Sequence, residues 1–243
     1  MRFGDIRAFF NGIYSVSSQI KMRQILRHER PDIVHIHNLF PLISPSVLPE
    51  CEKTGIPAVM TVHNYRLICP NGLFMTEGQV CEKCSDGHEY HCILKNCEQH
   101  LFKSAGYALR NYLARKMRLF SDNITMYAAL TEFQRKKLIM QGFPMDKIVV
   151  IPNMIKTNVT ITQSPIGEYV GFAGRISPEK GISTLMDAAR NCGDISFKAA
   201  GNYDKMPELV PKSPKNFEFS GHLGASDMNR FLSLSRLIVL PSI

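Results

Sequence analysis

The chain has 243 residues, 44% of them hydrophobic and 21% charged, and a net charge of +8 at neutral pH. This is the composition of a globular protein with enough apolar residues for a core. No run of about eighteen apolar residues occurs, which excludes a membrane-spanning helix. The first residues contain no apolar run followed by a small-residue cleavage site, so we expect a cytoplasmic protein.

Short runs rich in β-branched residues alternate with helical patterns in the first part of the chain. Strands are expected at residues 33–36, 58–62, 126–130 and 148–151, and helices at 45–54 and 131–141. A polar stretch without clear periodicity, residues 156–165, follows them. We place a domain boundary there, between a first domain of residues 1–155 and a second of residues 166–243.

A new alternation begins after this boundary. Strands are expected at residues 168–172, 195–199 and 237–240, and helices at 181–191 and 225–235. Strands that alternate with helices form parallel sheets through crossover helices. The sequence therefore predicts the α/β class, with a parallel sheet in each domain.

Parallel strands bind ligands beyond their carboxyl ends, so the residues that directly follow each strand are candidates for chemistry. In the first domain these are His37 and Asn38 after one strand and His63 after the next. His63 is either functional or a histidine that is hydrogen-bonded at a strand end. His35 and His37 share one strand face, and we expect His35 to be buried and His37 to face an acceptor cleft.

The second domain opens with the strongest constellation, the segment GFAGRISPEKG at residues 171–181. A strand runs into a glycine-containing turn and then into a helix start marked by Ser177, Pro178 and Glu179. Helix N-termini suit phosphate, and Arg175 and Lys180 flank this one. The alternative is a strand–helix connection that carries two solvated cations.

The same segment resembles the G-R-x-x-x-E-K-G signature that opens the donor domain of family 4 glycosyltransferases. FKAAG, NFEFSG and SLSRLIVLPS resemble later parts of that domain, and PDIVHIHN, VMTVHNYRLICPNG and KIVVIPN resemble the acceptor domain. The order of these motifs matches the family over nearly the whole chain. The resemblance implies the GT-B fold, in which two Rossmann-like domains enclose a nucleoside-diphosphate sugar.

The resemblance also implies roles for individual residues. Arg175 and Lys180 would hold the diphosphate and stabilise the charge of the leaving group, and His63 resembles the cleft histidine that contacts the donor sugar. Gly201 would let the backbone approach the donor closely. The implied donor-binding residues are Gly174, Gly201, Asn202 and Gly221, and the implied acceptor-side residues are His37 and Asn38.

The implied reaction is the transfer of a sugar, with retention, from a UDP-, GDP- or other nucleoside-diphosphate sugar to a glycan or lipid-linked acceptor. Surface polysaccharide biosynthesis is the expected setting. No cofactor is implied for catalysis, because the cations of the chain stabilise the leaving group.

Both domains are expected to be incomplete. Family members begin with a strand and a glycine-rich loop, whereas the start of this chain, residues 1–16, resembles a later helical stretch. They also continue beyond the end of this chain into a segment with two glutamates that grip the donor. We therefore expect a polypeptide truncated at both ends, with weak stability and little turnover, and an inactive remnant is the alternative to an enzyme.

Five of the seven cysteines lie close together in the sequence. They belong to a segment, residues 69–100, that we interpret as an inserted loop, and they are Cys69, Cys81, Cys84, Cys92 and Cys97. The spacing permits a structural zinc site, and disulfides or free thiols are the alternatives. A zinc-containing nucleic-acid-binding module would also use the basic charge, but it explains neither GRISPEKG nor the strand pattern, so no nucleic acid partner is expected.

Residues 101–120 are predicted to form a helix with five basic and no acidic residues. Its apolar residues recur at helical spacing. One interpretation is a helix that docks on the sheet through this stripe. The other is a surface for peripheral association with anionic lipid at the inner face of the cell membrane.

Overall fold

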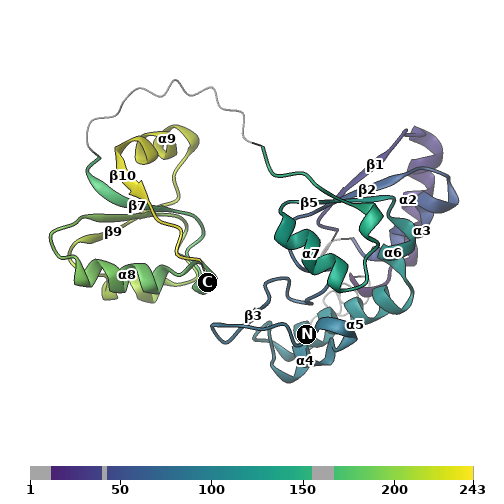
Figure 1. Cartoon of the computed structure of the whole chain (residues 1–243), viewed down its shortest axis with the longest axis horizontal. Coiled ribbons are helices and arrows are strands. Elements are labelled where there is room, and N and C mark those ends of the chain that lie inside the picture. The colour runs from purple at the N-terminus through teal and green to yellow at the C-terminus, as the bar shows by residue number, and fades with distance from the viewer. Residues whose placement is uncertain (1–11, 40–42, 155–166, 243) are drawn as a thin grey trace. The chain divides into compact units, whose positions relative to one another are not determined.

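The computed structural model describes residues 12–39, 43–154 and 167–242. The chain divides into two compact units, Met1–Ile155 and Lys156–Ile243 (Figure 1). Residues 1–11, which hold most of the helical start expected from the sequence, lie outside the described ranges.

The first unit is built on a parallel sheet with the strand order β1-β2-β5-β6. Its strands are β1 (Val34–His37), β2 (Ala58–Val62), β5 (Met126–Ala129) and β6 (Ile148–Val150). The register places His37 opposite Thr61, so that β1 and β2 end within a few residues of each other. The four strands lie within one residue of the ranges predicted from the sequence.

The core of this unit is formed by side chains of the sheet and of the helices around it. The helices are α2 (Val16–Glu29), α3 (Leu48–Lys53), α6 (Leu119–Asn123) and α7 (Glu132–Met140), with a 3₁₀ turn at Met145–Lys147. The fully buried side chains include Leu48, Val62, Ile124, Tyr127 and Leu138.

The chain around α3 departs from the single helix predicted at residues 45–54. A 3₁₀ turn, Pro45–Val47, comes first, and α3 starts anew at Leu48. Proline has no backbone N–H to donate, so it is tolerated only in the first turn of a helix. Pro45 and Pro49 each occupy such a position, which divides the segment in two.

The cysteine-rich segment is more structured than the loop expected from its sequence. A two-stranded antiparallel pair, β3 (Met75–Thr76) with β4 (Gln79–Val80), is followed by a 3₁₀ turn at Ser85–Gly87 and α4 (Tyr90–Leu94). Helix α5 (Leu101–Lys116) packs against α4. The helix predicted for residues 101–120 ends at Lys116, because Arg118 has a left-handed backbone, φ 53°, before α6 begins.

The second unit repeats the architecture with the strand order β10-β7-β8-β9, all parallel. The strands are β7 (Tyr169–Ala173), β8 (Phe197–Ala200), β9 (Phe217–Gly221) and β10 (Ser235–Ile238). Helices α8 (Ile182–Asn191) and α9 (Ala225–Leu234) and 3₁₀ turns at Pro178–Lys180 and Pro207–Lys212 complete it. The predicted class, α/β with two Rossmann-like parallel sheets, is confirmed.

Candidate functional site

Two histidines meet at the carboxyl edge of the first sheet. His37 ends β1 and His63 follows β2, and their Nδ1 and Nε2 atoms are 2.7 Å apart. One residue further along each strand, Asn64 Nδ2 donates to Asn38 Oδ1 at 3.0 Å. The imidazole pair and the amide pair are therefore successive cross-strand contacts. They bring together three residues predicted to be functional from the sequence, His37, Asn38 and His63.

The contact between the imidazoles limits their charge. One ring nitrogen must donate and the other accept, so only one of the two rings can be protonated without breaking the bond. Partial burial, followed by the nearby His37 and His35, lowers the pKa of His63 below its ordinary value. At neutral pH, His63 is therefore an uncharged group that can take part in hydrogen bonds to a ligand.

Replacing His37 with alanine is expected to raise the pKa of His63 toward its ordinary value of 6.5, because the substitution uncovers the ring and removes a nearby charge. In the native chain, stability linked to His63 is present above the ordinary pKa and is lost as the pH falls below it and through the lowered pKa of the folded state. NMR titration of the His63 ring would measure the change. His35→Ala, which removes the smaller electrostatic effect, should give a smaller rise, and an unchanged or lower pKa in His37→Ala would contradict the interpretation.

The expectation that His35 is buried is wrong. Its side chain is exposed, and its Nε2 lies 2.8 Å from Thr61 Oγ1. Alternation along β1 explains this, because Ile36 points into the core and its two neighbours point to the opposite face. Within the described residues that face is open, and the His35 and His37 rings lie against each other with centroids 4.1 Å apart.

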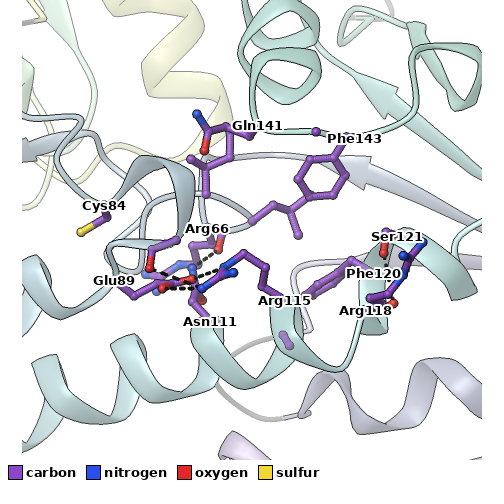
Figure 2. A pocket seen from close by; sticks show the side chains of 15 residues that line it. Arg66, Cys84, Glu89, Asn111, Arg115, Arg118, Phe120, Ser121, Gln141 and Phe143 are labelled. Atoms are coloured by element: carbon purple, nitrogen blue, oxygen red, sulfur yellow. Dashed lines mark hydrogen bonds and ion pairs between the residues drawn. The ribbon is translucent and has the colours of Figure 1, made fainter.

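A pocket of about 280 Å³ lies beside this edge, between the loop after β2, the cysteine-rich segment, α5 and the end of α7 (Figure 2). Its polar centre is an ion pair, in which Arg115 Nε lies 2.8 Å from Glu89 Oε1. The apolar walls include Phe120 and Phe143. Arg66 lines both this pocket and a smaller one that also contains Asn38 and His63, so the two pockets adjoin.

Two glycines give the pocket arginines their room. A Cβ at Gly72 would lie 2.6 Å from Arg66 Cγ, and one at Gly87 would lie 2.6 Å from Arg115 Cζ. Both glycines have positive φ values, +80° and +87°, which other residues rarely adopt. The glycines therefore shape the turns and also let the aliphatic part of Arg66 and the guanidinium group of Arg115 lie against the backbone.

A buried polar group next to the pocket was not predicted from the sequence. Arg110 is buried in α5 and donates to Asn111 Oδ1, while Asn111 Nδ2 donates to the carbonyl oxygen of Arg66 at 2.8 Å. Burial, together with the charge of Arg66, lowers the pKa of Arg110 to about 10. The one feature of the sequence that could have pointed to this group is the position of Arg66, three residues after His63 in the loop that follows β2.

The five clustered cysteines are free thiols. Cys84 and Cys92 are buried in a small core with Ala108, and burial raises the pKa of Cys84 to about 12. In the described ranges, no group of three or more His, Cys, Asp or Glu side chains is arranged to hold a metal ion. The thiols lie near one another, since Cys69, Cys97 and Cys81 add to the effect of burial on the pKa of Cys84. They do not form a set of metal ligands, and the zinc site stays a prediction from the sequence.

In the second unit, three predicted donor-binding glycines meet at the carboxyl edge of the sheet. Gly174 N donates to Ala200 O at 2.9 Å, and Gly201 N donates to Gly221 O at 2.8 Å. A Cβ at Gly201 would lie 1.9 Å from the carbonyl oxygen of Gly174. The residues that follow β7 and β8 and the last residue of β9 are therefore joined through backbone atoms. The fourth residue, Asn202, is exposed and hydrogen-bonds to Asp204.

The helix start expected at Ser177 has a different form. Pro178–Lys180 is a 3₁₀ turn, and α8 begins at Ile182 after Gly181, whose φ is +69°. A Cβ at Gly181 would lie 1.9 Å from Pro241 O, which explains why the reversal takes a glycine. Ser177 therefore does not cap α8, and its buried Oγ has no hydrogen-bond partner among the described residues.

Arg175 and Lys180 lie at either end of this short segment. The Arg175 side chain is 75% exposed, and its Nη2 atom is 3.4 Å from Glu179 Oε1. An ion pair this exposed contributes little to stability, so the guanidinium group is available to a ligand at small cost. The Lys180 side chain is partly exposed.

Residues 4–159 match the model of Glycosyltransferase Family 4, which is well over half of the 243 residues. The chain belongs to this family. The family 4 chain is 27% identical over 235 residues to an uncharacterised 42.6 kDa protein in the cps region of Klebsiella pneumoniae, a match that covers 94% of the chain and 56% of the relative.

Solved structures agree on the fold. HepE of Anabaena, crystallised with UDP and glucose, matches the family 4 chain with a TM-score of 0.60 and 15% identity, over 92% of the chain and 56% of HepE. The lipopolysaccharide outer core galactosyltransferase WaaB matches with a TM-score of 0.53 and 13% identity, over 100% of the chain and 57% of WaaB. The family 4 chain thus spans about half the length of these proteins. No helix in its described ranges is long and apolar enough to cross a membrane.

Proposed function

We propose that this chain provides donor-binding and acceptor-binding surfaces of a retaining glycosyltransferase. The enzyme transfers a sugar from a nucleoside-diphosphate sugar to a glycan or lipid-linked acceptor. The family supports this reaction type, because family 4 enzymes are generally retaining and use nucleotide sugars. The relative in the cps region supports a role in capsule or other surface polysaccharide biosynthesis.

The observation that carries the proposal is the carboxyl edge of the second sheet. Gly174, Gly201 and Gly221 form a surface without side chains there, on which a ligand can approach the backbone. Arg175 directly follows Gly174, and Lys180 ends the 3₁₀ turn that comes next, so the two side chains would supply two positive charges for a diphosphate. As the bond to the sugar breaks, negative charge grows on the diphosphate, and fixed cations that neutralise it lower the barrier.

The first unit supplies the other half of the proposed function. His63, uncharged at neutral pH, would hydrogen-bond to a sugar hydroxyl, with its orientation fixed by His37. The adjoining pocket, with the Arg115–Glu89 ion pair and aromatic walls, suits an acceptor that carries both hydroxyl groups and apolar surface. Asn38 lines the smaller pocket together with His63.

The diphosphate site can be tested by calorimetric titration of the chain with UDP and with GDP. Arg175→Ala/Lys180→Ala is expected to weaken binding about 100-fold or more, because it removes two charge-assisted contacts. The matched control is Arg190→Ala/Lys215→Ala, which removes the same charge. Arg190 lies at the end of α8 and Lys215 lies two residues before β9, so both belong to the opposite edge of the sheet.

The control should bind like the native chain. Equal binding by both double variants would remove Arg175 and Lys180 from the site. The absence of binding to a folded native chain, verified by circular dichroism, would contradict the proposed donor site.

A further inference from the structure

Helix α5 keeps its polar side inward. Leu109 and Tyr112 of the apolar stripe are 41% and 43% exposed. The buried residues of the helix are small or polar, namely Ser104, Gly106, Ala108, Arg110, Asn111 and Ala114. This contradicts the interpretation that the helix docks on the sheet through its apolar stripe. Burying polar side chains is unfavourable unless they are hydrogen-bonded, so the partners of the inward side are informative.

Two adjacent side chains of this inward side, Arg110 and Asn111, are only 4% and 7% exposed. Arg110 Nε and Nη2 both donate to Asn111 Oδ1, the Nε atom at 3.1 Å. A guanidinium group can only donate, so the oxygen of the Asn111 amide faces Arg110 and the nitrogen faces away from it. This nitrogen donates to the carbonyl oxygen of Arg66 at 2.8 Å (Figure 2). Asn111 thereby ties α5 to the loop after β2.

The series of hydrogen bonds continues from the backbone of Arg66. Arg66 N donates to Asn64 Oδ1 at 3.0 Å. A backbone N–H can only donate, so the nitrogen of the Asn64 amide is left to donate to Asn38 Oδ1, also at 3.0 Å. The direction of each hydrogen bond is therefore fixed by groups that have a single role. We name this series the amide relay, formed by Arg110, Asn111, Arg66, Asn64 and Asn38.

The amide relay ends beside the histidine pair. Asn64 directly follows His63, and Asn38 directly follows His37, so the last bond of the relay lies next to the 2.7 Å contact between the two imidazoles. All members of the relay except Asn111 also line the smaller pocket, together with His63. A displacement of the loop after β2 would therefore move His63 relative to His37 and change the shape of this pocket.

We propose that Asn111 is a positioning residue for His63. By holding the carbonyl oxygen of Arg66, it fixes the loop after β2 on α5, and this loop keeps His63 within hydrogen-bond distance of His37. The bond between Asn64 and Asn38 is exposed, whereas those of Asn111 are buried or half-buried and therefore stronger. A role of this positioning in sugar transfer rests on the proposed function, but the positioning itself can be measured without any substrate.

The substitution Asn111→Asp isolates the link between α5 and the loop. The carboxylate has nearly the shape of the amide and still accepts from Arg110, but it cannot donate to the carbonyl oxygen of Arg66. The amides of Tyr65 and Ile68 are hydrogen-bonded within the loop, to Gly72 O and Tyr65 O. Their hydrogen exchange is expected to become about tenfold faster in the variant, because a hydrogen bond that holds the loop is lost.

The ring nitrogens of His63 provide the signature of positioning. Their ¹⁵N signals are expected to change in Asn111→Asp, because the contact with His37 loosens. The signals of His35, whose ring contacts Thr61, should not change. The amides of β5, which lies inside the sheet, should keep their protection, since the effect is confined to the loop.

A second variant, Arg110→Met/Asn111→Leu, removes the same link without leaving a buried charge, and it should have the same effects. It keeps the test decisive if Asn111→Asp does not fold. Both variants lower the net charge by one, as does the matched control Asn96→Asp. Asn96 Oδ1 accepts from Ser104 Oγ at 3.1 Å, and an aspartate would keep this bond. The control should therefore exchange like the native chain.

The proposal is overturned if a folded variant without the link shows native exchange in the loop and native His63 signals. It is also overturned if exchange becomes faster throughout the first unit, β5 included, because Asn111 would then contribute only to general stability. Equal changes in Asn96→Asp would assign the effect to charge and overturn it as well. The titrations with UDP and GDP can fail without affecting this test, since no nucleotide is present in it.

Discussion

Substituting Gly201 with alanine is expected to destabilise the second unit by about 3 kcal/mol. The added Cβ would lie 1.9 Å from the carbonyl oxygen of Gly174 and 3.1 Å from its carbonyl carbon. These are backbone atoms that cannot rotate away as the end of a side chain does. Gly174 and Gly201 are also hydrogen-bonded to Ala200 and Gly221, so relief of the clash must disturb the sheet edge.

Hydrogen exchange of the amides in β7 and β8 would measure this loss within the second unit. Gly193→Ala is the matched control, because a Cβ at Gly193 meets nothing within 4 Å and its φ is not positive. The control is expected to exchange like the native chain. UDP binding should also weaken in Gly201→Ala, since the same edge carries the proposed diphosphate site. Equal protection in the two variants would show that the contact between the loops is not tight.

Acidification is expected to remove about 3 kcal/mol of stability from the first unit through Glu50. The Glu50 side chain is 1% exposed and lies 2.6 Å from Arg23 Nε and 3.0 Å from Lys53 Nζ. These contacts, the hydrogen bond from Arg23 first, lower the pKa of Glu50 from 4.5 to about 2. Because the unfolded chain binds the proton more readily, the stabilisation is complete above the ordinary pKa and is lost as the pH falls toward 2.

Urea unfolding, followed by circular dichroism from neutral pH to about pH 2, would measure this dependence. In Glu50→Gln the acid-dependent loss should shrink, although the variant is less stable at neutral pH. Arg23→Ala leaves a buried carboxylate with Lys53 alone and should cost about 3 kcal/mol. Glu29→Gln, at a carboxyl group that is 64% exposed, is the control and should change little. If Glu50→Gln loses as much unfolding free energy in acid as the native chain does, this carboxylate is not the cause.

The sequence predicted the positions of the strands well, and with them much of the candidate site. Carboxyl ends of parallel strands share one edge of a sheet, so residues that follow strands are brought together whatever the details of packing. This is why His37 and His63 meet in the first unit, and Gly174 and Gly201 in the second. The predictions depended on local patterns that few tertiary contacts can overrule.

The pocket beside the histidines was not predictable in this way. Glu89, Arg115 and Phe143 come from segments that are far apart in the sequence and have no common spacing. Gly201 also has a structural requirement that the sequence did not indicate, because a side chain there would clash with the carbonyl oxygen of Gly174. Such requirements arise from backbone contacts between loops, which leave no periodic trace in a single sequence.

Taken by itself, the sequence determined the alternation of strands and helices, the parallel sheets and the residues at their carboxyl edges. The tertiary structure alone decided which side of α5 faces water, since periodicity reports that a helix has two unlike sides but not which of them is inside. The hydrogen bonds of Ser104 and Asn111 made that choice and left Leu109 and Tyr112 exposed. Polar partners on neighbouring segments, not the apolar stripe, thus set the orientation of this helix.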